Sequence, residues 1–410
     1  MVFDDVRVAG ELSVLSLYEG FFSGGARILH SDVLAGLHAR GQRHRVLSIH
    51  GEVYREATLQ RMQDDPCYRK LVAAGLAVSA LRAGTGPERF GPAELATLER
   101  AASGADVILT LKEQPLRLIN QAGVRDTPVI TCLHRSDPQN QGPALAQLRT
   151  SVNSGAIAAL VCCAESTREA YRAVGIPAGL FEVIPNGVDL RRFRPDRRAR
   201  AGLRRTLGIP SDAPVIVFAA RYDLMKNVPL FLAAGAVFLA ARPNAHLLLC
   251  GAGMTAANPL LEADLAAVGF QGSPRVHLLG VRDDPQALFA TADIVSLTSA
   301  FGEAAPLCLI EGMMCGAIPV ATDIGDCASI VDGRGLLTPP DPQAIAAAWS
   351  EALGRREQFA PALLAGRERF GRRRMIAAYA SLLRRTSRPS RTSAGRTRLP
   401  LSPATACPAA

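Results

Sequence analysis

Short apolar runs rich in β-branched residues alternate with amphipathic helical patterns along nearly the whole chain. In the stretch 28–37, for example, Leu29, Val33 and Leu37 recur at helical spacing. This alternation is typical of parallel sheets that helices cover on both faces. It predicts strands at Leu12–Tyr18, Arg45–Ile49, Val78–Leu81, Asp106–Leu111, Pro128–Leu133, Ala159–Ala164, Glu182–Ile184, Pro214–Ala220, His246–Cys250, Val276–Leu279, Ile294–Thr298 and Pro319–Thr322.

The chain is long enough for two such sheets. Its 410 residues exceed one ordinary core and suffice for two. Pro185-Asn-Gly-Val-Asp189 and the arginine-rich stretch after it interrupt the pattern before a fresh strand begins. We predict an α/β fold with two facing, Rossmann-like, doubly wound domains, at residues 1–188 and 189–370. A helix at 371–385 and a disordered basic tail at 386–410 should follow.

Composition narrows the class of protein. Hydrophobic residues make up 48% and charged residues 20%, as in globular proteins. The start of the chain lacks the layout of a secretion signal. We also expect no apolar run to reach the ~18 residues that a membrane-spanning helix needs. We therefore expect a cytoplasmic protein. The nine cysteines contain no Cys-x-x-Cys pair, so we interpret them as reduced, core-filling thiols.

The net charge of +9 is concentrated in two segments. Residues 191–205 hold eight arginines and one aspartate, and residues 384–410 hold six arginines and no acid, which together give +13. The rest of the chain is therefore at 9 − 13 = −4. Phe193 is the single aromatic residue among these arginines, which is too few for the stacking of successive bases, so we do not expect nucleic-acid binding. Attraction to an anionic membrane surface fits the clusters better.

Ligands of parallel sheets lie beyond the carboxyl ends of the strands, so residues placed there are candidates. Gly24-Gly25 follows the first predicted strand and would let backbone N–H groups approach a phosphate, although it also suits a plain tight turn. His134 follows the strand Pro128–Leu133 and could hydrogen-bond a sugar hydroxyl. The alternative is a histidine satisfied at the start of a loop.

Two basic residues follow the first strand of the second half. Arg221 comes directly after Pro214–Ala220, and Lys226 lies five residues later in a chain with only three lysines. Converging cations would stabilise the negative charge that builds on a leaving diphosphate. A surface-exposed pair is the competing interpretation.

Two glutamates flank the start of a predicted helix. Pro306 suits the first turn of this helix and Gly316 its end. Glu303 lies in the loop before the helix, and Glu311 lies on the helix eight residues later. Buried carboxylates need hydrogen-bond donors, which ribose and hexose hydroxyls would supply. For an isolated pair of glutamates, a capping residue and a solvated helix face would be the simpler explanation.

These motifs resemble those of the large retaining glycosyltransferase family 4, which has the glycosyltransferase B fold, over about residues 12–383. The members that look most similar are bacterial enzymes that build exopolysaccharide or lipopolysaccharide. The most specific part of the resemblance is the segment from Glu303 to Glu311, together with the following Gly316-Ala-Ile-Pro-Val-Ala-Thr-Asp-Ile-Gly-Asp326. Other motifs occur in the family's order, namely Gly24-Gly25, Pro185-Asn-Gly-Val-Asp189 and the Arg221–Lys226 spacing.

The resemblance implies transfer of a hexose-type sugar from a UDP- or GDP-sugar to a glycan, lipid-linked or small-molecule acceptor. Arg221 and Lys226 would bind the donor diphosphate, Glu311 the ribose hydroxyls and Glu303 the sugar hydroxyls. Backbone amides would assist Glu303, around Ala305, Leu307 and Cys308. The family keeps the anomeric configuration and generally needs no metal, and this chain has no Asp-x-Asp element to hold one.

On the N-terminal side, Gly24-Gly25 and His134 would lie near the phosphate and the acceptor. The helix around Arg372–Leu383 would cross back to the first domain. The chain departs from the family pattern where glycines are usual, at Ala220 and Asn227 and at Ala304-Ala305 in place of Gly-Phe. These changes bear on the shape of the sugar pocket and hence on the identity of the donor.

Two other readings compete with this one. A nicotinamide-dependent dehydrogenase should show Gly-x-Gly-x-x-Gly after its first strand, and Gly24-Gly25 does not fit that pattern. A non-catalytic sugar-nucleotide-binding or assembly subunit with the same fold remains an alternative, which the presence of all four charged residues argues against.

Overall fold

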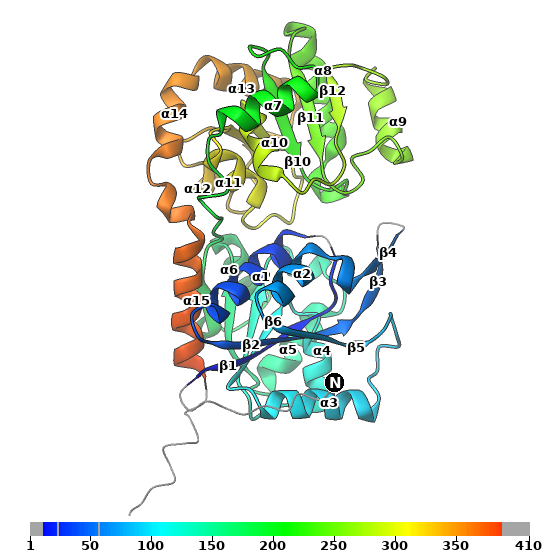
Figure 1. The fold of residues 1–410 in the computed structure, drawn as a ribbon, viewed down its shortest axis with the longest axis vertical. Helices are drawn as coiled ribbons and strands as arrows, with labels where there is room; N and C mark the ends of the chain where they lie inside the picture. The colour runs from blue at the N-terminus through cyan, green and yellow to red at the C-terminus, as the bar shows by residue number, and fades with distance from the viewer. Residues whose placement is uncertain (1–10, 23, 56–57, 388–410) are drawn as a thin grey trace, which may run out of the picture.

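The structure is a computed structural model that describes residues 11–22, 24–55 and 58–387. Each half of the chain forms a parallel sheet between layers of helices, so the predicted α/β fold is confirmed (Figure 1). The first sheet has the order β5 (Ala77–Arg82), β2 (Arg43–His50), β1 (Ser13–Tyr18), β6 (Val107–Leu111), β7 (Val129–Leu133), β8 (Ile157–Cys162) and β9 (Phe181–Val183). The second has the order β12 (Val276–Leu278), β11 (His246–Cys250), β10 (Val215–Ala219), β13 (Ile294–Leu297), β14 (Ile318–Thr322) and β15 (Leu336–Thr338).

Every strand expected from the sequence is present, with ends that differ by at most two residues. Three short strands were not expected. The antiparallel pair β3 (Glu52–Arg55) and β4 (Thr58–Arg61) lies outside the two large sheets, and β15 is a three-residue edge strand. None of the three has the continuous apolar run that marks a strand buried on both faces.

Helices cover both faces of the first sheet. One face packs on α1 (Gly25–His38), α2 (Pro66–Ala73) and α15 (Arg372–Thr386). The other face packs on α3 (Pro92–Ser103), α4 (Leu116–Ala122), α5 (Ala144–Asn153) and α6 (Glu165–Ala173). Successive residues of a strand therefore pack into different cores, one on each face of the sheet, as Val14 and Leu15 of β1 do.

The second domain has one large core around Trp349. The rings of Phe231 and Phe238 lie 5.4 and 5.5 Å from the Trp349 ring, and the indole N–H donates to the Ser296 hydroxyl at 3.0 Å. The helices around this sheet are α7 (Arg197–Thr206), α8 (Val228–Ala241), α9 (Pro259–Ala267), α10 (Pro285–Thr291), α11 (Leu307–Met314), α12 (Cys327–Val331), α13 (Pro342–Gly354) and α14 (Arg356–Leu364).

One stretch of the described chain, Leu224–Ala241, is long and apolar enough to cross a membrane by length and composition. The expectation that no run reaches this length is therefore wrong for these residues. The stretch includes α8, which buries Phe231, Leu232 and Phe238 in the core of the second domain. Packing of α8 against its sheet and against α13 accounts for its hydrophobicity.

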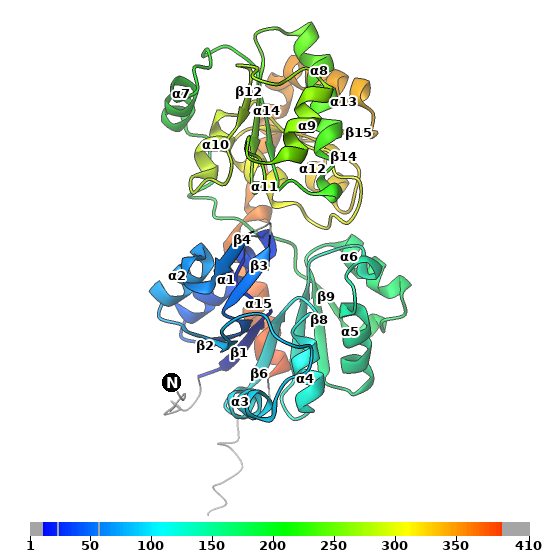
Figure 2. The same ribbon diagram turned by 90° about the vertical axis from the view of Figure 1, so that its right-hand side faces the viewer.

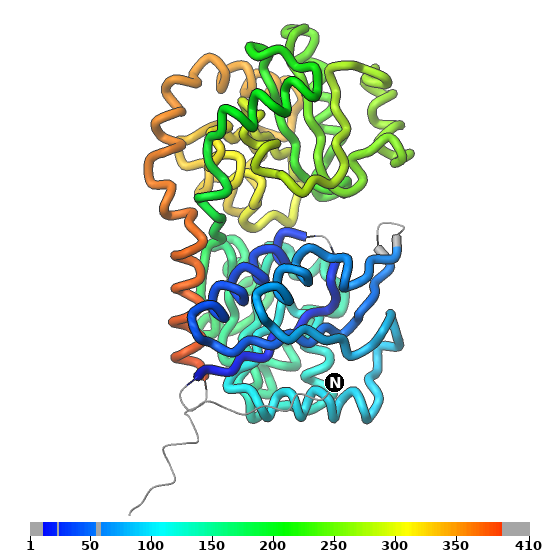
Figure 3. The backbone as a smooth tube through the Cα atoms, in the orientation of Figure 1, coloured from blue at the N-terminus to red at the C-terminus, as the bar shows by residue number. Residues whose placement is uncertain are grey.

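The chain passes twice between the domains, and the two passages bond to each other (Figure 3). The Val188 amide donates to the Phe370 carbonyl and the Arg372 amide to the Val188 carbonyl, each at 2.8 Å. A Cβ on Gly187 would lie 2.8 Å from the carbonyl oxygen of Gly371, so no side chain fits at that position. The predicted domain boundary at 188/189 falls within the first passage.

The helix α15 runs beside the first domain after the second passage (Figure 1). Its Met375, Ile376 and Tyr379 join the core that α1 covers. Arg372 donates to the Asp189 carboxylate at 2.9 Å and lies 3.5 Å from that of Asp32 on α1. The helix ends at Thr386, one residue beyond the predicted helix end at 385, and residues 388–410 lie outside the described residues.

Cysteines in the described part of the chain form no disulfide, and all but the partly buried Cys308 are buried. The side chains of the adjacent residues Cys162 and Cys163 pack in different places. Cys162 lies in a core of the first domain, whereas Cys163 packs with Ala164 against Ala304 of the second.

The arginine-rich segment is partly a folded element rather than a solvated linker. Arg200 and Arg204 of α7 donate to the Asp293 carboxylate at 2.7 and 2.9 Å, and Arg356 donates to it at 2.6 Å. Arg204 and Asp293 are buried. Asp293 therefore fixes α7 and the start of α14 to the second sheet.

We predict that Asp293→Ala lowers the free energy of unfolding by about 3–5 kcal/mol, because it leaves the buried Arg204 guanidinium without its counter-charge. Urea denaturation followed by circular dichroism measures the change. Asp284→Ala is the matched control, because Asp284 pairs with Arg282 but is 44% exposed. This control should cost less than about 1 kcal/mol. Equal losses in the two variants would contradict the role given to Asp293.

Candidate functional site

The carboxyl edges of the two sheets face each other and touch at a few polar contacts. The Ser136 hydroxyl donates to the backbone carbonyl of Glu303. The Asp326 carboxylate accepts from the backbone amides of Glu165 and Ser166, at 2.8 and 2.9 Å. Figure 2 shows α6 of the first domain on the side that faces α11 and α12 of the second. The loops after the strands of both sheets thus border one interdomain opening.

Lys226 and Glu303 form an ion pair at this opening. Their side chains are 15% and 6% exposed. Lys226 ends the 3-10 turn Leu224–Lys226, and Asn227 follows with φ 51°, a left-handed conformation that asparagine tolerates in place of the glycine usual there. The Ser299 hydroxyl donates to the Glu303 carboxylate at 2.6 Å. The sequence-predicted lysine and glutamate are therefore in direct contact.

Arg221 belongs to the same loop but has a different partner. Its Nε donates to the Asp223 carboxylate at 2.9 Å. Burial raises the pKa of Asp223, but the Met225 amide and the charges of Arg221 and Lys226 outweigh this and lower it overall. Asp223 thus lies near both cations and partly neutralises them. The sequence reasoning did not identify this carboxylate.

Glu311 lies on α11, one helical turn after Cys308. Burial raises its pKa to about 8, and the charge of Arg192 opposes this shift. Burial also raises the pKa of the Cys308 thiol to about 12, while Lys226 lowers it and both glutamates raise it. Cys308 is therefore near all three charged groups, which places them around the first turn of α11.

Two helix N-termini meet across the opening. Helix α11 begins at Leu307, and α1 begins at Gly25 after an extended Gly24. A Cβ on Gly25 would lie 3.2 Å from Cδ1 of Leu307, so the glycine allows a close approach of the two turns. First-turn amides of a helix lack intrahelical acceptors and attract anions. The amides of Leu307 and Cys308, beside Lys226, are such groups.

The opening also receives His134 from the first domain. Burial lowers its pKa to about 3, and the charge of Lys112 adds to this effect. The imidazole is therefore neutral near pH 7, and its Nε2 has no hydrogen-bond partner among the described residues. A neutral ring nitrogen of this kind can exchange a hydrogen bond with a ligand hydroxyl.

The structure thus brings together residues from both halves of the chain. The backbone around Ala305 lies at the same place, since its carbonyl accepts from the Asn186 side chain at 2.8 Å. Sequence reasoning missed Asp223, Lys112 and Asp326. Lys112 follows β6 directly, and Asp223 follows β10 by a few residues. The rule that residues after strands are candidates, which found Lys226 and His134, could therefore have found both. Asp326 acts across domains, which sequence spacing does not reveal.

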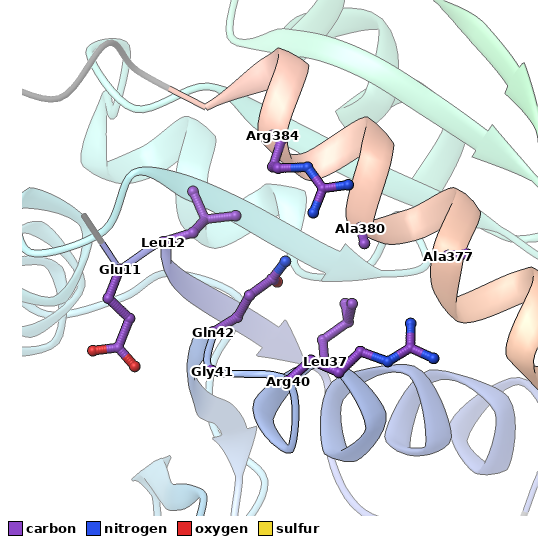
Figure 4. A pocket seen from close by; sticks show the side chains of 9 residues that line it. All are labelled: Glu11, Leu12, Leu37, Arg40, Gly41, Gln42, Ala377, Ala380 and Arg384. Atoms are coloured by element: carbon purple, nitrogen blue, oxygen red, sulfur yellow. The ribbon is translucent and has the colours of Figure 1, made fainter.

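One cavity lies at the amino end of the first sheet, and another lies at the carboxyl end of the second sheet. One, of about 380 Å³, lies at the amino end of β1 between α1 and α15, away from the opening (Figure 4). Its lining includes Glu11, Arg40 and Arg384. The other, of about 430 Å³, lies at the carboxyl ends of β13, β14 and β15 and is lined in part by Ser299, the partner of Glu303. The second cavity borders the charged cluster.

Two family models match most of the chain. The model "Glycosyl transferase 4-like domain" matches residues 24–187, and the model "Glycosyl transferases group 1" matches residues 213–355. Among solved structures, HepE from Anabaena has a TM-score of 0.76 at 21% identity and covers 92% of this chain and 100% of its own. Sucrose-phosphate synthase from Thermosynechococcus elongatus has a TM-score of 0.69 at 21% identity, with 92% and 99% covered.

The curated relatives include D-inositol 3-phosphate glycosyltransferases. That of Xylanimonas cellulosilytica is 30% identical over 248 residues, which are 57% of this chain and 58% of the relative. That of Corynebacterium jeikeium is 35% identical over 184 residues, 43% of each chain. The chain spans about half the length of the curated relatives it matches. With both domain models and the fold in agreement, this chain belongs to the glycosyltransferases of the B fold, in the family 4 group.

Proposed function

We propose that the chain is a retaining glycosyltransferase that moves a hexose-type sugar from a nucleotide diphosphate sugar to a hydroxyl of a glycan, lipid-linked or small-molecule acceptor. One observation carries the proposal. Lys226 and Glu303 are paired at the point where the N-termini of α1 and α11 meet. A cation and two sets of free amides converge there beside two carboxylates, as a sugar diphosphate requires.

The positive groups would stabilise the leaving diphosphate. Negative charge grows on it as the glycosidic bond breaks, and fixed cations and amides that already point to it lower the barrier. Lys226 and Arg221 supply the cations, and α11 supplies first-turn amides. Each cation is balanced by a carboxylate in the structure described here, Glu303 or Asp223. A bound diphosphate would take over Lys226 from Glu303.

The carboxylates would then be free to hold the donor's hydroxyl groups. Glu303 would accept hydrogen bonds from the sugar, next to the backbone around Ala305, and Glu311 would accept them from the ribose. His134 reaches the same opening from the first domain and would hydrogen-bond a hydroxyl of the sugar or the acceptor. In this scheme the protein's own charges do the work for which other transferases use a metal ion.

UDP is the first nucleotide to test, with GDP as the alternative. HepE, which has a similar fold, was solved with UDP, with UDP and glucose, and with UDP-glucose. The curated relatives are named for D-inositol 3-phosphate, a small polyol phosphate, which adds this class to the acceptors worth testing.

We also propose that the enzyme acts in the cytoplasm, at the inner face of the membrane, in the synthesis of bacterial polysaccharide. Arginines of the 191–205 segment support membrane contact, since most remain exposed after Arg200 and Arg204 are committed to Asp293. Exposed arginines near an anionic surface gain about 1 kcal/mol each.

Lys226→Ala should reduce kcat by about 10²–10³-fold, or about 3–4 kcal/mol, because the leaving diphosphate loses a cation. The measurement is steady-state transfer or donor hydrolysis with UDP- and GDP-sugars, alongside a thermal unfolding curve. Lys70→Ala is the matched control, because Lys70 is also ion-paired, with Asp32, but lies on α2 outside the opening. Unchanged turnover in Lys226→Ala defeats the assignment. Binding without turnover in the wild type favours the non-catalytic subunit.

Donor binding should tighten as the pH rises from about 6.5 to 8 and level off above that. The Glu311 pKa is about 8, and only the ionised carboxylate accepts hydrogen bonds from both ribose hydroxyls. Binding below pH 8 should therefore release a proton, with about a tenfold gain in affinity per pH unit at most. Titration calorimetry of UDP in buffers of different ionisation enthalpy measures the proton. Glu311→Gln should bind weakly and release none. An unchanged pH profile in that variant refutes the role.

The product should keep the anomeric configuration of the donor, and a chelator should leave the rate unchanged. Proton NMR of the first product formed distinguishes retention from inversion. Turnover measured in excess EDTA, and again with added Mg²⁺ or Mn²⁺, tests the metal-independent scheme. Loss of activity with EDTA and its return with a divalent cation would contradict that scheme.

A further inference from the structure

The carboxyl edge of the first sheet carries positive charge that the donor scheme leaves unused. The chain has three lysines. Lys70 is ion-paired with Asp32 and Lys226 with Glu303. Lys112, directly after β6, has no ion-pair partner in the described part of the chain. An unpaired and partly buried ammonium is costly, and a bound anion would offset that cost.

Strand register places Lys112 beside His134. Leu111 of β6 is paired with Cys132 of β7, and the Lys112 amide donates to the Cys132 carbonyl at 3.0 Å. His134 follows β7 on the neighbouring strand. Lys112 has φ 65°, in the left-handed region, which costs a non-glycine residue about 1 kcal/mol or more. The Thr110 hydroxyl donates to its carbonyl at 2.8 Å and helps to hold this conformation.

The acid next in sequence is engaged elsewhere. Glu113 is buried and accepts from the Tyr171 hydroxyl and, at 3.3 Å, from the Gln141 side chain. Burial raises its pKa to about 7. Burial likewise lowers the pKa of Lys112 to about 8, which the charge of Glu113 only partly opposes. Glu113 therefore does not neutralise Lys112 through a direct contact.

A second cation nearby has spare capacity. Arg27 on α1 is 5% exposed, its Nη1 donates to the Phe22 carbonyl and its guanidinium stacks 3.8 Å from the Phe22 ring, and only its Nε has no hydrogen-bond partner among the described residues. It is near enough to Lys112 to lower the pKa of that lysine. His134 Nε2 is also buried without a partner. By contrast, Arg135 is already neutralised, with its Nε 2.6 Å from the Asp137 carboxylate.

This edge lies directly opposite the Glu303 loop. A Cβ on Gly302 would be 2.9 Å from the Asp137 carboxylate and 3.1 Å from Nη2 of Arg135. A ligand held by Lys112 and His134 would thus approach the donor sugar from the first domain. The groups proposed to bind the donor's phosphates, Lys226 and Arg221, belong to the second domain. The unpaired cations of the first domain are therefore on the acceptor's side.

We propose that Lys112, beside His134, binds a phosphate-type anionic group of the acceptor, so that the enzyme selects acceptors bearing such a group near the reacting hydroxyl. The inference rests on the proposed function. A compact ammonium that is partly shielded from water suits a phosphate, whose oxygens accept several charge-assisted hydrogen bonds. The adjacent neutral His134 would accept or donate a hydrogen bond at the acceptor hydroxyl.

Inorganic phosphate is the probe for this site. In a thermal-shift titration, phosphate should stabilise the wild-type chain further when UDP or GDP already saturates the donor site. Lys112→Gln should weaken the phosphate response about tenfold or more, with the nucleotide response unchanged, whereas Lys112→Arg should keep most of both. Lys70→Gln is the matched control and should keep both responses.

The outcomes are separable. A wild-type chain saturated with nucleotide that gains nothing from phosphate overturns the proposal. So does a Lys112→Gln variant that loses the nucleotide response, because Lys112 would then serve the donor diphosphate. A chain that responds to phosphate through Lys112 but to neither nucleotide keeps the anion site and refutes the proposed function instead.

Discussion

In a parallel sheet every strand leaves its carboxyl end at one edge, and this chain turns both such edges to the same opening. Helices that follow those strands then begin there, so their amides and positive ends collect in one place. The contact of Gly25 with Leu307 brings two of these beginnings together. Without this shared direction, Lys226, Glu303 and His134 would not lie at one opening.

Charge at the opening is balanced by pairs that a ligand can exchange. Lys226 is ion-paired with Glu303 and Arg221 with Asp223, so each cation has a counter-charge when no ligand is bound. Such pairing avoids the cost of isolated buried charges. The opposite edge differs, because Lys112 has no such partner among the described residues and Glu113 is held by Tyr171. In the proposed scheme the two edges would therefore bind different ligand groups.

The fold could be read from the sequence because buried parallel strands are continuous apolar runs, and Ile216 to Phe218 or Leu247 to Leu249 permit little else. The short strands β3, β4 and β15 lack such runs and were missed. Residues after strands could be chosen by position alone, which found Lys226 and His134. The contacts between the domains could not be predicted, because Ser136 meets Glu303 and Asp326 meets α6 only when the two domains dock. The arginines of α7 looked like solvated charge because Asp293 lies some 90 residues later in the chain.

The joined passages at Val188 and Gly371 limit how the two halves can move. Because the two segments are hydrogen-bonded to each other, they must bend together, as a single strap rather than as two independent tethers. Gly187 leaves no room between them for one to slide past the other. Any separation of the sheets is then a swing about that strap. In such a swing each residue of the second domain moves in proportion to its distance from the strap. The side of the opening farthest from the strap therefore widens most, while the two hydrogen-bonded segments stay together.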